Sequence, residues 1–349
     1  MYKLLSIVVP VYKVEPYINK CLDSCLIYKT NEQGEKVLDE ELMNQLEVVI
    51  VNDGTPDRSA QMSREYVKHF PQTFRQIDKE NGGHGSAWNV GLKEATGKYL
   101  RFLDSDDWLT NLDRLMLDLK DCDADVVFNP FKVVCLSDMS FVISRPSLEE
   151  EYNSSDGCRT FPITRKNWNG GENKYSSVNF WSVTYKTKIL KPLWPLFAEK
   201  VMYDDYILTW AALAHGRTCM AFDYVLYNYL EGRPGNTMSV SQMQKRAFSY
   251  DVCFRQYEAK RQKIDESVIP KDLLECIDEM IADYALFVFW YEAFLPYRKA
   301  KVNLKHLYEV YIKEGLSTPV LKRYVRLPFF LFYWIEHLRY AKNKRKENA

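Results

Sequence analysis

Buried strands alternate with amphipathic helices along the first hundred residues. Continuous apolar, β-branched runs at Leu4–Val9 and Leu46–Val51 are typical of strands that are buried on both faces of a sheet. Further strands are expected at 74–78 and 99–103, and helices at about 16–26, at 57–69 and at the stretch that ends at residue 95. Strands that alternate with helices in this way predict a mostly parallel sheet with right-handed crossovers.

The pattern changes after about residue 125. Helical periodicity dominates beyond about residue 239, and earlier in the chain the polar stretch 29–41 predicts a loop or a short insertion. Between residues 125 and 239, short strands and helices are expected at 125–128, 141–143, 187–197 and 204–215. The regions that we predict from these changes are 1–125, 126–238 and 239–349.

Composition and charge restrict the class of protein. The 349 residues include 47 Lys and Arg against 47 Asp and Glu, and this balance argues against duplex nucleic acid as the main partner. The eight cysteines are scattered and form no C-x-x-C pair, which favours reduced, buried thiols over a zinc site or a disulfide framework. The first apolar run is too short for a leader, and no apolar stretch approaches about 18 residues. We therefore expect a cytoplasmic protein.

Polar clusters follow three of the predicted strands. Asp53 follows the second strand, a glycine-rich loop at 81–86 follows the third, and the acidic run 104–107 follows the fourth. In open parallel sheets, ligands bind beyond the carboxyl ends of the strands. Asp104 and Asp106 could share a hard cation such as Mg²⁺ or Mn²⁺, although an aspartate in this position also caps helices. The glycine-rich loop suits a phosphate or sugar oxygen, and it equally suits a plain turn.

Four segments carry a resemblance to a known family. They are Ser6–Tyr12, Val51–Asp57, Asn81–Leu92 and Gly97–Asp107. In order and spacing, over about the first 110 residues, they resemble the motifs of family 2 glycosyltransferases. The resemblance implies an α/β GT-A fold, with a Rossmann-like, mostly parallel central sheet and flanking helices, and the helical C-terminal region predicted above follows it. It also implies an inverting transfer of a sugar from a nucleotide diphosphate.

The resemblance assigns a role to individual residues. Asp106 is expected to bind the metal, Mn²⁺ or Mg²⁺, on the donor diphosphate. Asp205, in the segment Met202–Tyr206, takes the position of the general base, although acidic residues also stabilise helix N-termini. The residues expected to bind the donor are Pro10, Tyr12, Asp53, Gly83, His84, Asp104, Ser105 and Arg233. Region 1–125 would then bind the nucleotide-sugar, and region 126–238 would provide the acceptor side and the base.

Two positions depart from the family pattern. Lys13 follows Tyr12 where the family usually has Asn, and Trp88 stands where the family often has Arg. If that arginine serves the nucleotide, its charge must come from elsewhere, and Arg101 and Arg233 are the candidates. We expect Trp88 to pack in the core. His84 is the histidine we expect at the donor or acceptor, whereas His215 suits a helix C-terminus.

Together these features predict a metal-dependent transfer from a nucleotide-sugar, most simply a UDP-sugar, to a hydroxyl of a glycan or lipid-linked acceptor in surface polysaccharide assembly. A sugar-nucleotidyltransferase also needs paired carboxylates on a nucleotide-binding sheet, but it would release pyrophosphate. A non-catalytic nucleotide-sugar-binding protein would keep Asp53 and lose the base.

The C-terminal tail combines an apolar run with basic residues. Residues 327–335 are apolar and aromatic, and residues 320–349 carry eight basic side chains against two acidic ones. This pattern suits peripheral contact of residues 327–346 with an anionic membrane surface at the inner face of the plasma membrane. A terminal helix that packs on the protein, with a frayed basic end, fits the tail equally well.

Overall fold

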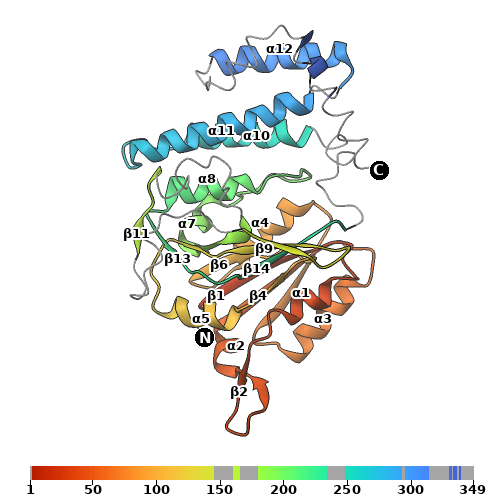
Figure 1. Ribbon diagram of the computed structural model, residues 1–349, viewed down its shortest axis with the longest axis vertical. Helices are drawn as coiled ribbons and strands as arrows, with labels where there is room; N and C mark the ends of the chain where they lie inside the picture. The colour runs from red at the N-terminus through yellow and green to blue at the C-terminus, as the bar shows by residue number, and fades with distance from the viewer. Residues whose placement is uncertain are drawn as a thin grey trace. The chain divides into compact units, whose positions relative to one another are not determined.

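The computed structural model describes residues 2–144, 160–165, 180–233, 248–292 and 295–313, together with positions 330, 331, 333–335 and 338 (Figure 1). The chain divides into two compact units. The first contains residues 1–200 and 204–233, and the second contains 201–203 and 234–349.

An eight-stranded sheet forms the core of the first unit. Its strand order is β11-β13-β8-β12-β6-β1-β4-β5. The strands are β1 (Leu5–Val11), β4 (Leu46–Asp53), β5 (Phe74–Lys79), β6 (Tyr99–Phe102), β8 (Val126–Phe128), β11 (Phe161–Pro162), β12 (Val183–Lys186) and β13 (Thr218–Ala221). The half made of β6, β1, β4 and β5 is parallel throughout, whereas β12 runs antiparallel to both of its neighbours. The sheet is thus mostly parallel, as the alternation of strands and helices predicts.

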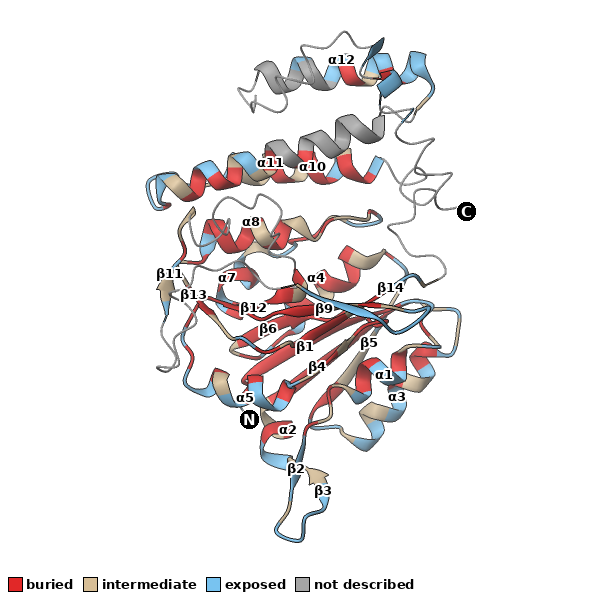
Figure 2. Cartoon of the chain, viewed as in Figure 1, coloured by how far each residue is buried: buried red, intermediate tan, exposed pale blue. Residues whose placement is uncertain are grey.

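Helices cover the buried strands on both sides (Figure 2). They are α1 (Ile18–Asp23), α2 (Glu40–Gln45), α3 (Ser59–His69), α4 (His84–Glu94), α5 (Leu112–Lys120), α7 (Thr187–Leu190) and α8 (Tyr206–His215), with 3₁₀ turns at Phe180–Ser182 and Lys191–Leu193. Helix α4 packs against β1 and β4. A Cβ at Gly91 would collide with Val8 of β1, so the close approach of helix and strand requires glycine there.

A smaller sheet has the order β10-β9-β14-β7, with β7 (Trp108–Leu109), β9 (Phe131–Cys135), β10 (Phe141–Ser144) and β14 (Tyr227–Glu231). Strand β14 pairs with both β7 and β9. Because β7 directly follows the acidic run 104–107, this pairing brings the end of β14 to the same edge as the carboxyl end of β6.

Two expectations from the sequence are wrong in detail. The stretch 29–41 contains the hairpin of β2 (Tyr28–Thr30) and β3 (Lys36–Leu38) instead of a loop throughout. The Asn31 side chain accepts hydrogen bonds from two backbone N–H groups of the turn, and Gly34 adopts a φ of 80°. The helix expected over 187–197 ends as α7 at Leu190, because Pro192 and Pro195 lack the N–H that a helix needs.

The second unit is helical where the structure describes it. It contains α10 (Phe248–Arg261), α11 (Lys271–Glu292) and α12 (Tyr297–Lys313), and α11 packs on both of the others. Tyr203 stacks on Tyr250 with ring centroids 4.6 Å apart. Among the described residues, no helix is both long enough and apolar enough to span a bilayer.

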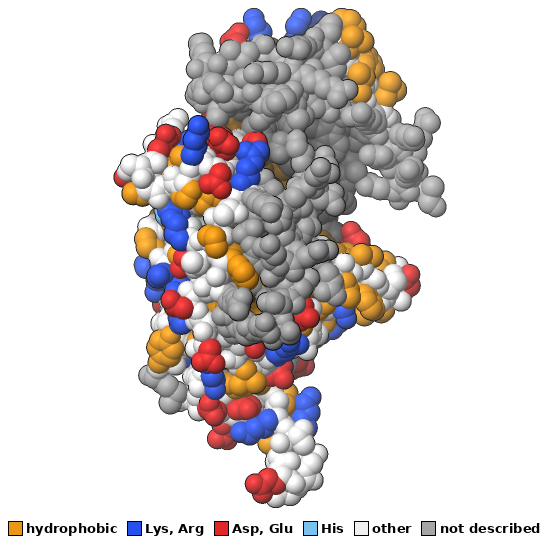
Figure 3. All heavy atoms as spheres, turned by 60° about the vertical axis from the view of Figure 1, so that its left-hand side comes forward, with side chains coloured by type: hydrophobic (Ala, Val, Ile, Leu, Met, Phe, Trp, Pro, Cys, Tyr) orange, Lys and Arg blue, Asp and Glu red, His pale blue; other side chains and the backbone are white. Residues whose placement is uncertain are grey.

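Charged side chains of both signs are interspersed over the described part of the face in Figure 3. The seven described cysteines are free thiols, as expected, and six of them are buried. Most of the basic tail lies outside the described residues.

Candidate active site

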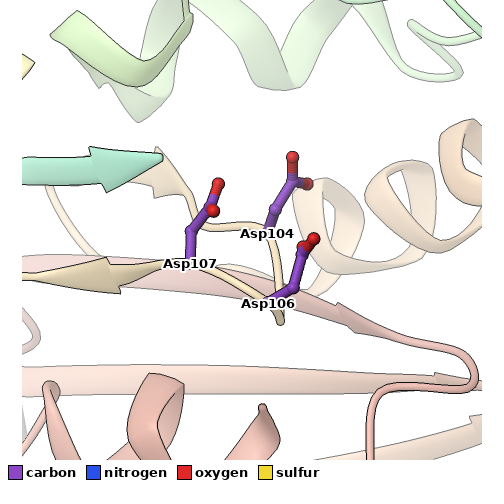
Figure 4. Close-up of side chains that lie close together, drawn as sticks. All are labelled: Asp104, Asp106 and Asp107. Atoms are coloured by element: carbon purple, nitrogen blue, oxygen red, sulfur yellow. The ribbon is translucent and has the colours of Figure 1, made fainter. Parts of the chain in front are cut away.

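Three carboxylates meet in the loop that follows β6. Ligand atoms of Asp104, Asp106 and Asp107 all lie within 4.8 Å of one another, and Figure 4 shows the three side chains projecting from this one loop. Oxygen ligands at this spacing suit a hard divalent cation such as Mg²⁺ or Mn²⁺. The residues therefore fit the metal that the sequence predicts at Asp106.

Asp107 ties the acidic loop to β14. Its two carboxylate oxygens accept hydrogen bonds from the Tyr227 hydroxyl at 2.6 Å and from the Leu230 backbone N–H at 2.7 Å. Burial and the charges of Asp106 and Asp104 raise the pKa of Asp107 well above its ordinary value. Since both oxygens already have partners, Asp107 anchors the loop, and Asp104 and Asp106 remain as the more available ligands.

Asp106 forms an ion pair with the Arg233 guanidinium. Burial and the neighbouring Asp104 raise the pKa of Asp106 to about 6, against the lowering effect of Arg233. Arg233 lies just beyond the end of β14, so the link between Asp107 and Leu230 also determines where this guanidinium lies. The structure thus brings together two residues that the sequence places 127 positions apart.

His84 begins α4 and faces the acidic loop. Its Nε2 donates a hydrogen bond to Oδ1 of Asp104 at 2.9 Å, and its Nδ1 lies 3.9 Å from Oδ1 of Asp204. Burial alone would lower the pKa of His84, but the two carboxylates raise it to about 10. His84 therefore joins the loop after β6 to the segment of the predicted base.

Asp53 lies at the carboxyl end of β4 and is almost fully buried. One carboxylate oxygen accepts from Lys79 Nζ at 2.6 Å and from the Gly82 N–H at 2.9 Å, and the other accepts from the Gly83 N–H at 2.9 Å. The carboxylate thus organises the glycine-rich loop. Gly83 has a φ of 88°, which a glycine adopts without strain.

The segment that leads to α8 carries two consecutive aspartates. Asp204 is buried, and its Oδ2 has no hydrogen-bond partner in the part of the chain that the structure describes. Asp205 is half-buried at the N-cap of α8, where burial and Asp204 raise its pKa to about 6. Of the two residues, Asp205 is the more exposed to solvent. It also lies within electrostatic range of His84 and Asp104.

The sequence alone does not identify what holds this segment in place. The Asn89 side chain on α4 accepts from the backbone N–H groups of Leu196 and Phe197 at 2.8 and 2.9 Å, and it donates to the Phe197 carbonyl. Ser86 donates to Glu199 at 3.1 Å. The Asn-x-Gly spacing in the third motif is the signal that could have pointed to Asn89, but its partners lie more than 100 residues away.

The remaining predicted residues divide between core and surface. Trp88 is fully buried, as expected, and packs against Phe102, Phe180 and Phe197. Arg101 is also fully buried and donates to Thr184 and Trp181, so of the two candidate cations Arg233 is the one at the acidic loop. Tyr12 is half-exposed after β1, whereas Pro10 and Ser105 are buried. His215 ends α8, and its ring contacts Trp210.

Comparison with known proteins shows what the chain is similar to. The sequence profile described as glycosyl transferase family 2 matches residues 6–150, which include the ends of β1, β4 and β6 and the whole acidic loop. The chain is a glycosyltransferase whose residues 6–150 match family 2. It is 28% identical over 264 residues to the uncharacterized glycosyltransferase EpsJ of Bacillus subtilis, with 74% of this chain and 69% of EpsJ covered.

A second relative shares a shorter region. The glycosyltransferase is 33% identical over 102 residues to the minor teichoic acid biosynthesis protein GgaB of Bacillus subtilis, covering 29% of this chain and 10% of GgaB. Among solved structures, residues 1–349 of Staphylococcus aureus TarS in complex with UDP match with a TM-score of 0.54 at 17% identity, covering 84% of this chain and 82% of that one. That likeness supports the GT-A fold of the glycosyltransferase.

Proposed function

We propose that this glycosyltransferase catalyses an inverting, metal-dependent transfer of a sugar from a nucleotide-diphosphate donor, most simply a UDP-sugar, to a hydroxyl of a glycan or lipid-linked acceptor. The observation that carries the proposal is the placement of a half-buried carboxylate, Asp205, near but separate from the carboxylate cluster after β6. The crystallised complex of TarS with UDP supports a uridine donor, and the name of GgaB supports a surface polymer as the product.

The donor side follows from the charges at the acidic loop. Asp104 and Asp106 would hold the cation, whose chemistry is to stabilise the negative charge that develops on the leaving diphosphate. Arg233 is the one cationic side chain paired with Asp106 among the described residues. Released from that carboxylate, its guanidinium can bind a diphosphate oxygen in the same place.

The acceptor side follows from the environment of Asp205. An inverting displacement needs a base that removes the proton from the attacking hydroxyl, and such a base works best when its pKa is near the working pH. Because the pKa of Asp205 is raised to about 6, its carboxylate is largely ionised at neutral pH and yet more basic than an exposed aspartate. Asp204 is too deeply buried to take this role.

A donor panel tests the proposal directly. Purified protein is incubated with Mn²⁺, a set of nucleotide-sugars and candidate acceptors, and nucleoside diphosphate release is measured with and without EDTA. We expect release with at least one donor and its loss in EDTA. Release of pyrophosphate would indicate a nucleotidyltransferase, and donor binding without any release would indicate a binding protein.

Two substitutions separate the roles. Asp205→Asn should lower the rate by about 10²-fold or more while donor binding persists, because general base catalysis contributes about 10²–10⁴-fold. Asp106→Ala should weaken donor binding only when Mn²⁺ is present. Asp223→Asn is the matched control, since this carboxylate is 73% exposed on the same unit. Retained turnover in Asp205→Asn would overturn the assignment of the base.

We also propose that residues 327–346 contact an anionic membrane surface. Five described apolar side chains in this stretch are 40–67% exposed: Phe330, Leu331, Trp334, Ile335 and Leu338. Tyr333 instead is buried, with its hydroxyl bonded to the Leu295 carbonyl. The i, i+4, i+8 spacing of the exposed residues places them along one side of a helix, and basic residues follow them in the sequence.

Liposome co-sedimentation tests the membrane contact. The full chain should sediment with vesicles that contain anionic lipid, and Trp334→Ser should reduce the bound fraction. Neutral vesicles and a variant at an exposed position of α5, Leu117→Ser, provide the controls. Binding that does not differ between the full chain and Trp334→Ser would contradict this role of the tail.

A further inference from the structure

His84 makes contacts on both sides of the site. Its Nε2 donates to the Asp104 carboxylate at 2.9 Å, and its Nδ1 faces the Asp204 carboxylate at 3.9 Å. Asp104 belongs to the loop that carries the cation ligands, and Asp204 directly precedes the proposed base. Since both ring nitrogens face carboxylates of the protein itself, His84 bridges two loops instead of presenting a nitrogen to the donor.

The imidazole ring is also fixed by packing. It lies against Trp88 with ring centroids 4.0 Å apart. Trp88 in turn contacts Phe102 of β6 at 4.7 Å and Phe197 of the segment that leads to Asp205 at 5.0 Å, measured between ring centroids. The aromatic cluster therefore touches the same two loops that the ring nitrogens join, and a tilt of the imidazole would disturb both.

Helix α4 and the loop before it provide further attachments for residues 194–200 and for Asp204. Asn89 holds the backbone at Leu196 and Phe197, and the Lys200 N–H donates to the Gly82 carbonyl at 2.9 Å. At Gly85 there is no room for a side chain, because a Cβ would collide with the Ala198 carbonyl and the Asp204 carboxylate. The segment is thus seated on the first two turns of α4, and His84 is the one residue of this helix with a described polar contact to Asp104.

We propose that His84 is a positioning residue that fixes the distance between the cation ligands after β6 and the base at the start of α8. The inference rests on the proposed function. A displacement of about 1 Å between reacting groups can cost 10²-fold in rate, so the loss of this bridge should act mainly on the chemical step. The donor contact expected from the sequence would instead act mainly on donor affinity.

Steady-state kinetics separate these two roles. His84→Leu removes both polar contacts and should lower kcat by about 10²-fold with a small change in the KM for the donor. His84→Gln retains a nitrogen that can donate to Asp104 and should recover part of kcat. His69→Leu, an exposed histidine on α3, is the matched control and should behave as wild type. Unchanged kcat in His84→Leu would overturn the proposal, and so would a raised KM with kcat preserved.

A second measurement does not depend on turnover. The ¹⁵N signals of the His84 imidazole should respond to both carboxylates, so Asp204→Asn should shift the Nδ1 signal and Asp104→Asn the Nε2 signal. Signals that are identical in the wild type and in Asp204→Asn would refute the bridge. If no donor supports release by the wild type, the proposed function fails, while the NMR result still decides whether His84 joins the two loops.

Discussion

Asp53→Asn is the substitution that best separates a residue that organises a loop from one that reads the donor. The Asp53 side chain is 4% exposed and accepts three hydrogen bonds, from Lys79, Gly82 and Gly83. An asparagine keeps the shape but places an NH₂ group against one of these donors and removes the charge from the ion pair. Breaking a buried ion pair outright costs about 3–5 kcal/mol, so this conservative change should cost about 2–4 kcal/mol.

Thermal unfolding followed by circular dichroism measures this cost. For a domain of this size, each kcal/mol shifts the melting temperature by about 2–4 °C, so we expect a decrease of about 4–16 °C. The matched control is Asp78→Asn on the neighbouring strand, where Asn52 pairs with Asp78 and Asp53 with Lys79. Asp78 is half-exposed, and its ion pair with Arg64 should contribute less than about 1 kcal/mol.

Titration with UDP completes the test. If Asp53 organises the loop, Asp53→Asn lowers the melting temperature and weakens binding of every nucleotide alike. A variant that melts as the wild type does but loses UDP binding would refute the reasoning. In that case the three hydrogen bonds would contribute nothing to stability, and the carboxylate would act on the donor, as expected from the sequence.

Two further predictions concern the base and the core. With donor and acceptor saturating, kcat should fall tenfold per pH unit below about pH 6, because Asp205 acts only when ionised and its pKa is raised to about 6; a flat profile down to pH 5 would contradict its role. Trp88→Ala should lower the free energy of unfolding in urea by about 3–5 kcal/mol. Trp88→Phe should cost less, since the buried indole N–H has no acceptor among the described residues, and equal costs for the two variants would argue against this account.

Much of the first unit could be predicted from the sequence because short runs of apolar residues indicate its strands. Each residue of β1 and β4 is buried, and a continuous apolar run is the direct signature of such a strand. The acidic loop could be found for the same reason, since Asp104 follows a buried strand at the edge where ligands bind. These features depend on neighbours in the sequence.

Other parts of the site depend on contacts that no local pattern specifies. Tyr227 and Asp107 are 120 residues apart, and Asn89 and Phe197 are 108 apart. The sequence shows that Asp53 lies at the end of a strand. It does not show that Asp53 bonds to the glycine-rich loop, because that contact depends on the path of the chain after β5. The helix expected over 187–197 ends at Leu190 because two prolines follow, and the spacing of apolar residues carries no information about prolines.

Helix α4 has a consequence for how proteins with this site can diverge. The loop before it contacts Asp53, and its first two turns hold the segment that leads to Asp205. A change in this loop or on these turns would therefore alter the surroundings of Asp53, proposed to bind the donor, and of Asp205, the proposed base, so substitutions there are restricted.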